Sequence, residues 1–319
     1  MSRGTRISTP RERPRPTSIE TRDPTTDDSN REARIELPLT HAVRLDDVEV
    51  SYTEIAGGGT PLVLLHGLTG HRDDFLPVMP RLRDRHPGLW LIAPDLRGHG
   101  DSTHPNDRGS YTFERLVGDL QTFLDQRGIA RCHLLGHSFG GMVSLRFALR
   151  FPARLASLVL LATAPFAPDG FSADLFEKSG DIAKARGMAF LQARIEENAR
   201  SSATSRPSDR ATLRWADAYW AHHRHRFRSM DPVAYRELGL AMVRQESLEQ
   251  RLAELALPVS VIVGELDEGF RAGADRLTAS IPAAVRFDIA EAGHHPHRED
   301  PDAWLDAVSA HLERVPVEL

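Results

Sequence analysis

The chain has 319 residues, of which 40% are hydrophobic and 27% are charged, and its 40 Lys and Arg residues against 45 Asp and Glu residues give a formal net charge of -5. This is the composition of an ordinary globular protein, long enough to bury a core without disulfides or metals. Because neither charge dominates, the composition gives no electrostatic reason to expect a nucleic acid or an anionic membrane as partner.

The first segment, residues 1 to about 34, is rich in Arg, Pro, Thr, Ser and Asp and almost free of apolar residues. We predict a disordered tail, because such a segment cannot bury enough surface to offset its ordering entropy. The chain has no apolar stretch of transmembrane length and no apolar core of a secretory signal. The single cysteine, Cys132, excludes an internal disulfide and a cysteine-based metal site. These features favour a cytoplasmic protein.

Order is predicted to begin near Leu37, with strands at Val43–Leu45 and Val48–Ile55 around a turn at Asp46–Asp47. The following strands are short, wholly apolar runs, which are typical of strands buried on both faces of a parallel sheet. They are Pro61–His66, Leu89–Ala93, His133–Leu135, Leu158–Leu161 and Val259–Val263, with a weaker, alternating run at Val285–Ile289.

Helical periodicity fills the gaps, at Phe113–Gln126, Gly141–Arg150 and Ala303–Leu312. Strands that alternate with helices predict an α/β fold, with a mostly parallel twisted sheet and helices on both faces. One long stretch interrupts the alternation and is mainly helical, so we predict a lid that covers a site. The predicted parts are a first core segment, the lid and a second core segment, at residues 35–164, 165–250 and 251–319.

The sharpest motif is GHSFG at residues 136–140, between the strand at 133–135 and a predicted helix. A strand, G-x-S-x-G and a helix in this order form a nucleophile elbow, which predicts Ser138 as a nucleophile. The turn is tight, so the residues two before and two after the serine must be small, as Gly136 and Gly140 are. A chance match is the alternative, but the flanking strand and helix both stand where the elbow requires them.

Acyl transfer also needs two N–H donors aimed at the developing oxyanion. We expect one from Phe139, the residue after the nucleophile. We expect the second from Leu68, in the loop after the strand at 61–66. His66 is interpreted as a structural residue that shapes this loop; alternatively, His66 and Gly67 are only a strand-ending turn.

A serine hydroxyl needs an adjacent base that a third group holds, and in this fold the order along the chain is Ser, acid, His. His294 follows the last predicted strand and a glycine, and we predict it as the base, with His295 as the alternative. Asp267 follows the strand at 259–263 and is the predicted acid. The alternative acids are Glu265, Glu268 and Asp169, each of which could instead be a solvated carboxylate or a helix cap.

Two histidine-rich segments allow other interpretations. His294, His295 and His297 are close enough to suggest a metal site, but no partnering cysteine or H-E-x-x-H pattern accompanies them, so we predict no metal and no cofactor. The basic cluster at residues 222–226 is predicted to be a solvated helix face, with attraction of an acidic substrate as the alternative.

Four separated motifs resemble those of the α/β-hydrolase superfamily. They are LLHGL (64–68), PDLRGHGDS (94–102), GHSFGG (136–141), and GELD with AGHHPHREDP (264–301). The resemblance covers the chain from about residue 37 to 312. It implies a triad of Ser138, Asp267 and His294, and an oxyanion hole from Leu68 and Phe139. It also implies a structural role for Asp95.

The residues at the motifs narrow the type of activity. Haloalkane dehalogenases and epoxide hydrolases of this superfamily carry Asp at the elbow, where this chain has Ser138. The C-terminal motifs are similar to a menaquinone-pathway synthase, which has Arg and Tyr at the positions of Met142 and His137, and to meta-cleavage hydrolases, which have Trp at His295. The resemblance favours an esterase-like serine hydrolase acting on a small molecule. Alternatives are C–C or C–O bond cleavage of a dienol-type acid by the same triad, and a non-catalytic ligand-binding member of the fold.

Overall fold

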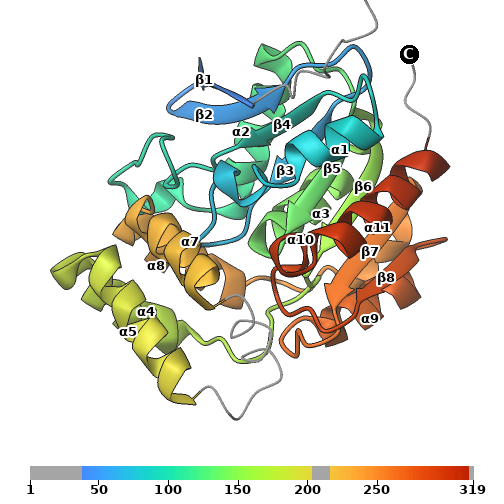
Figure 1. Cartoon of the computed structure of the whole chain (residues 1–319). Helices are drawn as coiled ribbons and strands as arrows, with labels where there is room; N and C mark the ends of the chain where they lie inside the picture. The colour runs from blue at the N-terminus through green and yellow to red at the C-terminus, as the bar shows by residue number, and fades with distance from the viewer. Residues whose placement is uncertain (1–37, 203–215, 316–319) are drawn as a thin grey trace, which may run out of the picture. The chain divides into compact units, whose positions relative to one another are not determined.

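Eight strands pair into one mixed sheet in the computed structural model, which describes residues 38–202 and 216–315 (Figure 1). The strand order is β1-β2-β4-β3-β5-β6-β7-β8. All described residues belong to one compact unit, Glu36–Leu319. The predicted tail at residues 1–34 and the predicted start of order near Leu37 lie outside the described residues.

An antiparallel hairpin forms one edge of the sheet, from β1 (Leu39–Arg44) and β2 (Glu49–Ile55). The turn between them includes Asp46–Asp47, as predicted. The predicted extent of the first strand, Val43–Leu45, is wrong, because β1 begins four residues earlier and Leu45 lies in the turn. An exposed edge strand has no buried face to impose an apolar alternation, so its sequence marks its start poorly.

The other six strands run parallel to one another and confirm the predicted positions to within a few residues. They are β3 (Leu62–Leu65), β4 (Leu91–Pro94), β5 (Cys132–His137), β6 (Leu155–Leu161), β7 (Val259–Gly264) and β8 (Val285–Ile289). Val63 and Leu65 pack into one hydrophobic cluster, and Leu62 and Leu64 into another. Both faces of β3 are therefore covered, which explains why its sequence is continuously apolar.

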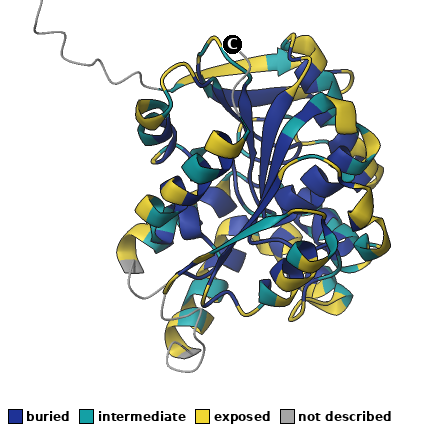
Figure 2. Ribbon diagram, turned by 90° about the vertical axis from the view of Figure 1, so that its right-hand side faces the viewer, coloured by how far each residue is buried: buried dark blue, intermediate teal, exposed yellow. Residues whose placement is uncertain are grey.

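Helices cover both faces of this sheet, and Figure 2 shows the buried strands between them. The longer core helices are α1 (Met79–Arg85), α2 (Phe113–Gln126), α3 (Phe139–Arg150), α9 (Arg271–Ser280) and α11 (Pro301–Arg314). The short ones are α10 (Pro296–Glu299), η1 (Arg72–Asp74), η2 (Arg108–Ser110), η3 (Pro152–Arg154) and η4 (Glu249–Glu254). The three helices predicted from periodicity are α2, α3 and α11, which confirms the α/β fold with helices on both faces.

The insertion between β6 and β7 is helical in its described part, as predicted. It contains α4 (Ala173–Arg186), α5 (Met188–Ser202), α7 (Ala216–Arg228) and α8 (Pro232–Val243), drawn together at one end of the strands in Figure 1. The insertion meets the core where the Asp231 N–H donates to the Gly98 carbonyl, 3.0 Å away. Within the described residues, no helix is both long and apolar enough to cross a bilayer.

Candidate active site

Ser138 stands at the sharp turn from β5 into α3, with φ 53° and ψ -118°. A non-glycine residue at positive φ is strained, so the surrounding structure must hold it there. The Ser138 N–H donates to the Leu161 carbonyl (2.8 Å), and Thr163 Oγ1 donates to the Ser138 carbonyl (2.7 Å). The neighbouring strand β6 and the residues after it therefore fix the elbow.

The two glycines of the motif are required by close packing of the backbone. A Cβ atom on Gly136 would lie 2.4 Å from the Gly140 carbonyl oxygen, and one on Gly140 would lie 2.4 Å from the His66 carbonyl oxygen. Both distances are too short for any side chain. The predicted need for small residues on either side of Ser138 is thus explained by contacts across the elbow and with the end of β3.

Two hydrogen bonds connect the three predicted side chains, with His294 between Ser138 and Asp267. His294 Nε2 lies 2.9 Å from Ser138 Oγ, and His294 Nδ1 lies 2.9 Å from Asp267 Oδ2. Ser138 and Asp267 are almost fully buried, whereas the His294 side chain is 28% exposed. This spacing allows proton transfer between the hydroxyl and the imidazole, with the carboxylate holding the opposite ring nitrogen.

Close backbone packing and one buried carboxylate hold the loop of His294. A Cβ atom on Gly264 would lie 2.1 Å from the Gly293 carbonyl oxygen, so the end of β7 must be glycine for the loop to approach. The Glu299 carboxylate accepts hydrogen bonds from the N–H groups of Gly293 and His295, on either side of His294. Burial raises the pKa of Glu299. Sequence reasoning missed Glu299, whose position in AGHHPHREDP carries no motif of its own.

The alternative acids and the alternative base do not reach the serine–histidine pair. Glu265, Glu268 and Asp169 are exposed, and Glu265 Oε2 instead accepts the Glu291 N–H. His295 Nε2 faces Arg226 Nη1 at 2.9 Å. Among the residues weighed for these two roles, the hydrogen bonds therefore connect Asp267 and His294 to Ser138.

The two expected oxyanion donors lie beside the nucleophile. Phe139 is the first residue of α3 and directly follows Ser138. A Cβ atom on Gly67 would lie 3.2 Å from Ser138 Cβ, so the loop that contains Gly67 and Leu68 packs against the elbow. Within the described residues, no hydrogen bond is found for the N–H of Leu68 or of Phe139. Neither N–H group is therefore engaged by another described residue, as an oxyanion donor requires.

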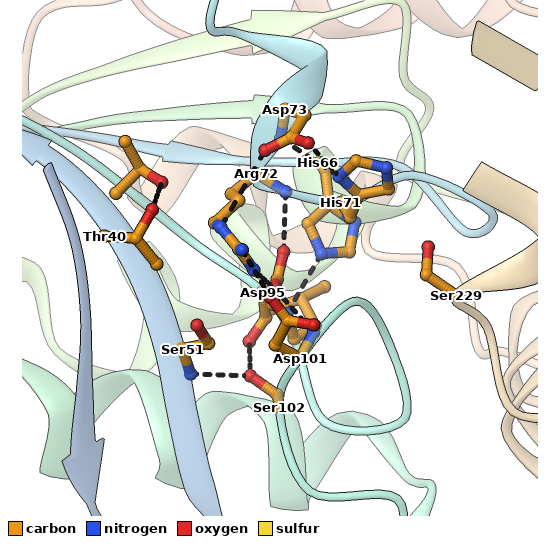
Figure 3. Close-up of polar contacts among 12 residues, drawn as sticks. Thr40, Ser51, His66, His71, Arg72, Asp73, Asp95, Asp101, Ser102 and Ser229 are labelled. Carbon is orange, nitrogen blue, oxygen red and sulfur yellow. Dashed lines mark hydrogen bonds and ion pairs between the residues drawn. The ribbon is translucent and has the colours of Figure 1, made fainter. Parts of the chain in front are cut away.

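His66 and Asp95 are buried and hold the loops after β3 and β4 through the polar contacts that Figure 3 draws. His66 Nε2 accepts the Leu96 N–H, which links the ends of β3 and β4. Asp95 accepts the N–H groups of Arg72 and Asp101 and pairs with the Arg72 guanidinium. Burial raises the pKa of Asp95 to about 6, although Arg72 opposes the shift.

A cavity of about 220 Å³ opens at Ser138 and is lined by core and insertion. Aromatic side chains from the insertion, including Phe176, Phe227 and Tyr235, form much of its wall, and Arg226 also lines it. A larger groove, about 660 Å³, runs over α2, α3 and α8, but Ser138 is not among its lining residues. The smaller cavity is the candidate site because Ser138 and His294, which are hydrogen-bonded to each other, both line it.

The basic cluster at residues 222–226 is only partly the solvated face that the sequence predicted. His223 and Arg226 are buried in the cavity wall, and His222 Nε2 lies 2.6 Å from the buried Asp74 carboxylate. Helical periodicity shows which residues share a face, but not which face packs against the core.

One group of potential metal ligands occurs among the described residues: His71, Asp73 and His225, with donor atoms within 4.8 Å of one another. His71 Nδ1 already accepts the Asp73 N–H, and His225 is exposed. Of the three histidines considered as a metal site from the sequence, His294 contacts Ser138 and Asp267, and His295 contacts Arg226. His297 is buried, and neither of its ring nitrogens has a hydrogen-bond partner among the described residues.

A family model described as alpha/beta hydrolase fold matches residues 60–301. The chain belongs to the α/β hydrolase family. It is 28% identical over 273 residues to the putative 2-succinyl-6-hydroxy-2,4-cyclohexadiene-1-carboxylate synthase of Bacillus subtilis (strain 168). This match covers 80% of the chain and 90% of that protein.

Two other α/β hydrolase matches show how widely the fold is shared. Lipase 3 of Moraxella sp. (strain TA144) is 33% identical over 133 residues, and the match covers 38% of this chain and 41% of the lipase. The crystal structure of the enol-lactonase from Burkholderia xenovorans LB400 has a TM-score of 0.73 at 23% identity, covering 86% of this chain and 100% of that one. This structural match shows the fold alone.

Proposed function

We propose that this α/β hydrolase is a serine hydrolase that cleaves a carboxylic ester or a related acyl bond of a small molecule through an acyl-enzyme. The observation that carries the proposal is the unbroken line of hydrogen bonds from Ser138 through His294 to Asp267 at the wall of a cavity. The proposal needs no metal and no cofactor.

In the proposed reaction, Ser138 Oγ attacks the substrate carbonyl while His294 Nε2 accepts its proton. Asp267 accepts the Nδ1–H of His294 and stabilises the imidazolium. The N–H groups of Leu68 and Phe139 bind the oxyanion of the tetrahedral intermediate. His294 then donates the proton to the leaving alcohol, and water releases the acyl group by the same proton path.

The helical insertion supplies the remaining walls of the proposed site. The cavity at Ser138 is lined by apolar side chains from several parts of the insertion. They are Phe171, just before α4, Phe176 in α4, Ile195 in α5 and Phe227 in α7. We therefore propose that residues 165–250 act as a lid that excludes water and selects the acyl or alcohol part of the substrate.

The direct test is replacement of the proposed nucleophile. Ser138→Ala should reduce the hydrolysis of short para-nitrophenyl esters by about 10⁶-fold and abolish labelling by a fluorophosphonate. Ser201→Ala, an exposed serine at the end of α5, should behave as wild type. Wild-type activity of Ser138→Ala would refute the assignment, and tight ligand binding without turnover in the wild type would indicate a non-catalytic member of the fold.

A second candidate is C–C or C–O bond cleavage of a dienol-type acid by the same three residues. The observation that favours it is Arg226, a cation that the insertion presents in the cavity wall. The Bacillus subtilis relative is named a synthase of a cyclohexadiene carboxylate. Turnover of a ring-fission dienol acid, with no hydrolysis of short para-nitrophenyl esters, would decide for this candidate.

A further inference from the structure

Arg226 is a buried cation in the wall of the proposed catalytic cavity. Its side chain is 5% exposed, and it comes from α7 of the insertion. The other described lining residues are apolar, aromatic, hydroxyl-bearing or histidine side chains, with no carboxylate among them. A guanidinium in such surroundings costs free energy unless an anion or several acceptors compensate it.

Among the described residues, the partners of Arg226 compensate the cost of burying its charge only in part. Its Nη1 donates to His295 Nε2 at 2.9 Å, and the same atom lies 3.9 Å from Asp74 Oδ2, beyond hydrogen-bonding distance. The other Asp74 oxygen is bonded to His222 at 2.6 Å. Arg226 Nε has no hydrogen-bond partner in the part of the chain that the structure describes. The guanidinium thus keeps donor capacity for a ligand.

The imidazoles around Arg226 are held neutral. Burial lowers the pKa of His295 well below its usual value, and the charge of Arg226 lowers it further. The same two causes, in the same order, lower the pKa of His223 to about 2. Arg226 is therefore the group in this part of the wall that can pair with an anion.

Arg226 lies close to the reacting groups. His295, which it contacts, has its ring centroid 5.2 Å from that of His294 and 5.1 Å from that of His137. The cavity, at about 220 Å³, is smaller than the pockets of roughly 300 Å³ or more that bind drug-sized ligands. A ligand that touches both Arg226 and Ser138 must therefore be compact.

We propose that Arg226 binds a carboxylate of the substrate, so that this site acts on a compact acyl compound with a carboxylate a few bonds from the scissile bond. A guanidinium can bind a carboxylate through two parallel N–H bonds, which fixes orientation as well as charge. The aromatic walls then hold the carbon skeleton. This inference rests on the proposed function of the cavity.

The test compares two esters of equal shape. One is the para-nitrophenyl hemiester of glutaric acid, and the other is its neutral isostere, in which an isopropyl group replaces the carboxylate. The readout is the ratio of kcat/KM for the anionic ester to kcat/KM for the neutral one, after subtraction of the reaction without enzyme. Wild type should favour the anionic ester, and Arg226→Gln should lower the ratio by about 10- to 100-fold, as expected for a lost charged hydrogen bond.

Two variants complete the design. Arg226→Lys keeps a cation beside Asp74 and should lower the ratio less than Gln does, and it carries the test if the Gln variant does not fold. Arg224→Gln is the matched control on the same helix, because Arg224 pairs with Glu196 and does not line the cavity. It should leave the ratio at its wild-type value.

The outcomes separate the inference from the proposed function. Turnover of both esters with the same ratio in wild type and in the Arg226 variants overturns the inference and leaves the serine hydrolase proposal standing. If wild type hydrolyses neither ester and is not labelled by a fluorophosphonate, the proposed function fails. Calorimetric binding of the methyl hemiester of glutaric acid and its isopropyl isostere then decides the inference: tighter binding of the anion, lost in Arg226→Gln, supports it, and equal binding overturns it.

Discussion

The sheet edge that carries Ser138, Asp267 and His294 and the insertion that covers it are built by different means. Ser138 directly follows β5, and Asp267 lies three residues after β7. Backbone turns and close glycine contacts hold both of them. The insertion is joined to the core by contacts between residues far apart in the chain. They include the backbone hydrogen bond from Asp231 to Gly98 and the side-chain bond between His222 and Asp74.

This difference separates the chemistry from the choice of substrate. At the strand ends, the backbone positions the reacting groups. The glycines there, such as Gly136 and Gly264, have no room for a larger residue. The insertion presents Arg226 and a set of aromatic rings through helix packing, which can vary without moving the strands. Changes at the sheet edge should therefore affect every substrate, and changes in the insertion should affect some substrates more than others. Substitutions in and around the two regions test this distinction, in order of decreasing effect.

After the loss expected for Ser138→Ala, the largest effect is expected for Asp267→Asn. The amide cannot stabilise the imidazolium and favours the wrong tautomer of His294, so kcat/KM should fall by about 10⁴-fold for every substrate. Steady-state kinetics on several para-nitrophenyl esters measure the loss. Glu265→Gln, an exposed residue two positions earlier, is the matched control. Equal losses in the two variants would contradict the role given to Asp267.

The next largest effect is expected for Asp74→Asn. Asp74 is fully buried, and His222 and the nearby Arg226 hold its pKa well below the usual range, although burial opposes this. Removing one partner of a buried charge pair costs about 3 kcal/mol of unfolding free energy. Urea denaturation measures the loss. Asp174→Asn, in the exposed pair with Lys178, should change stability by less than about 0.5 kcal/mol. Similar values for the two would show that Asp74 does not anchor the insertion.

Glu299 is expected to act as a positioning residue for His294. Glu299→Gln keeps the size of the side chain but replaces a charged acceptor of two N–H groups by a neutral one. A small displacement of His294 should lower kcat by roughly 10- to 100-fold while KM stays close to wild type. A purely structural role predicts lower stability with normal kcat per folded molecule, so kinetics normalised to fluorophosphonate-labelled sites distinguish the two.

The smallest effect, counted per pH unit, is a change in the pH dependence of stability. Burial lowers the pKa of His311 to about 3, where the imidazole bonds Ser260 and Ser157 between α11 and the sheet. Between about pH 6.5 and 3 the unfolded chain binds one proton more at this residue, so stability falls as the pH falls. His311→Gln should remove about 1.4 kcal/mol per pH unit from the slope in this window. Denaturation at several pH values measures it, with the exposed His104→Gln as control. An unchanged slope would contradict a neutral buried His311.

The fold was largely predictable because the buried strands and α2 obey strong local rules. A strand covered on both faces must be apolar throughout, and an amphipathic helix repeats its apolar residues every turn. The start of β1 was not predictable, because an edge strand exposes most of its side chains. The helical content of the insertion follows from periodicity, but its packing on the core depends on contacts between residues far apart in the chain.

The candidate site divides in the same way. Ser138, Asp267 and His294 could be proposed from sequence, because each must follow a strand and two of them need neighbouring glycines. Glu299 could not, since its role depends on where α10 packs. Arg226 could be named only as one member of the basic cluster at residues 222–226, because its place in the cavity wall depends on how α7 packs. A buried carboxylate or guanidinium in a polar-looking segment has the same local sequence as an exposed one.

The central claim is that the hydroxyl of Ser138 becomes acylated during turnover. The most direct measurement is mass spectrometry of peptides after rapid acid quenching of a reaction with a para-nitrophenyl ester, because slow deacylation in acid preserves the intermediate. We predict the mass of one acyl group on the peptide that contains Ser138, and none in Ser138→Ala. Ester turnover at full rate with no acyl group on that peptide, or with the group on another residue, would contradict the account.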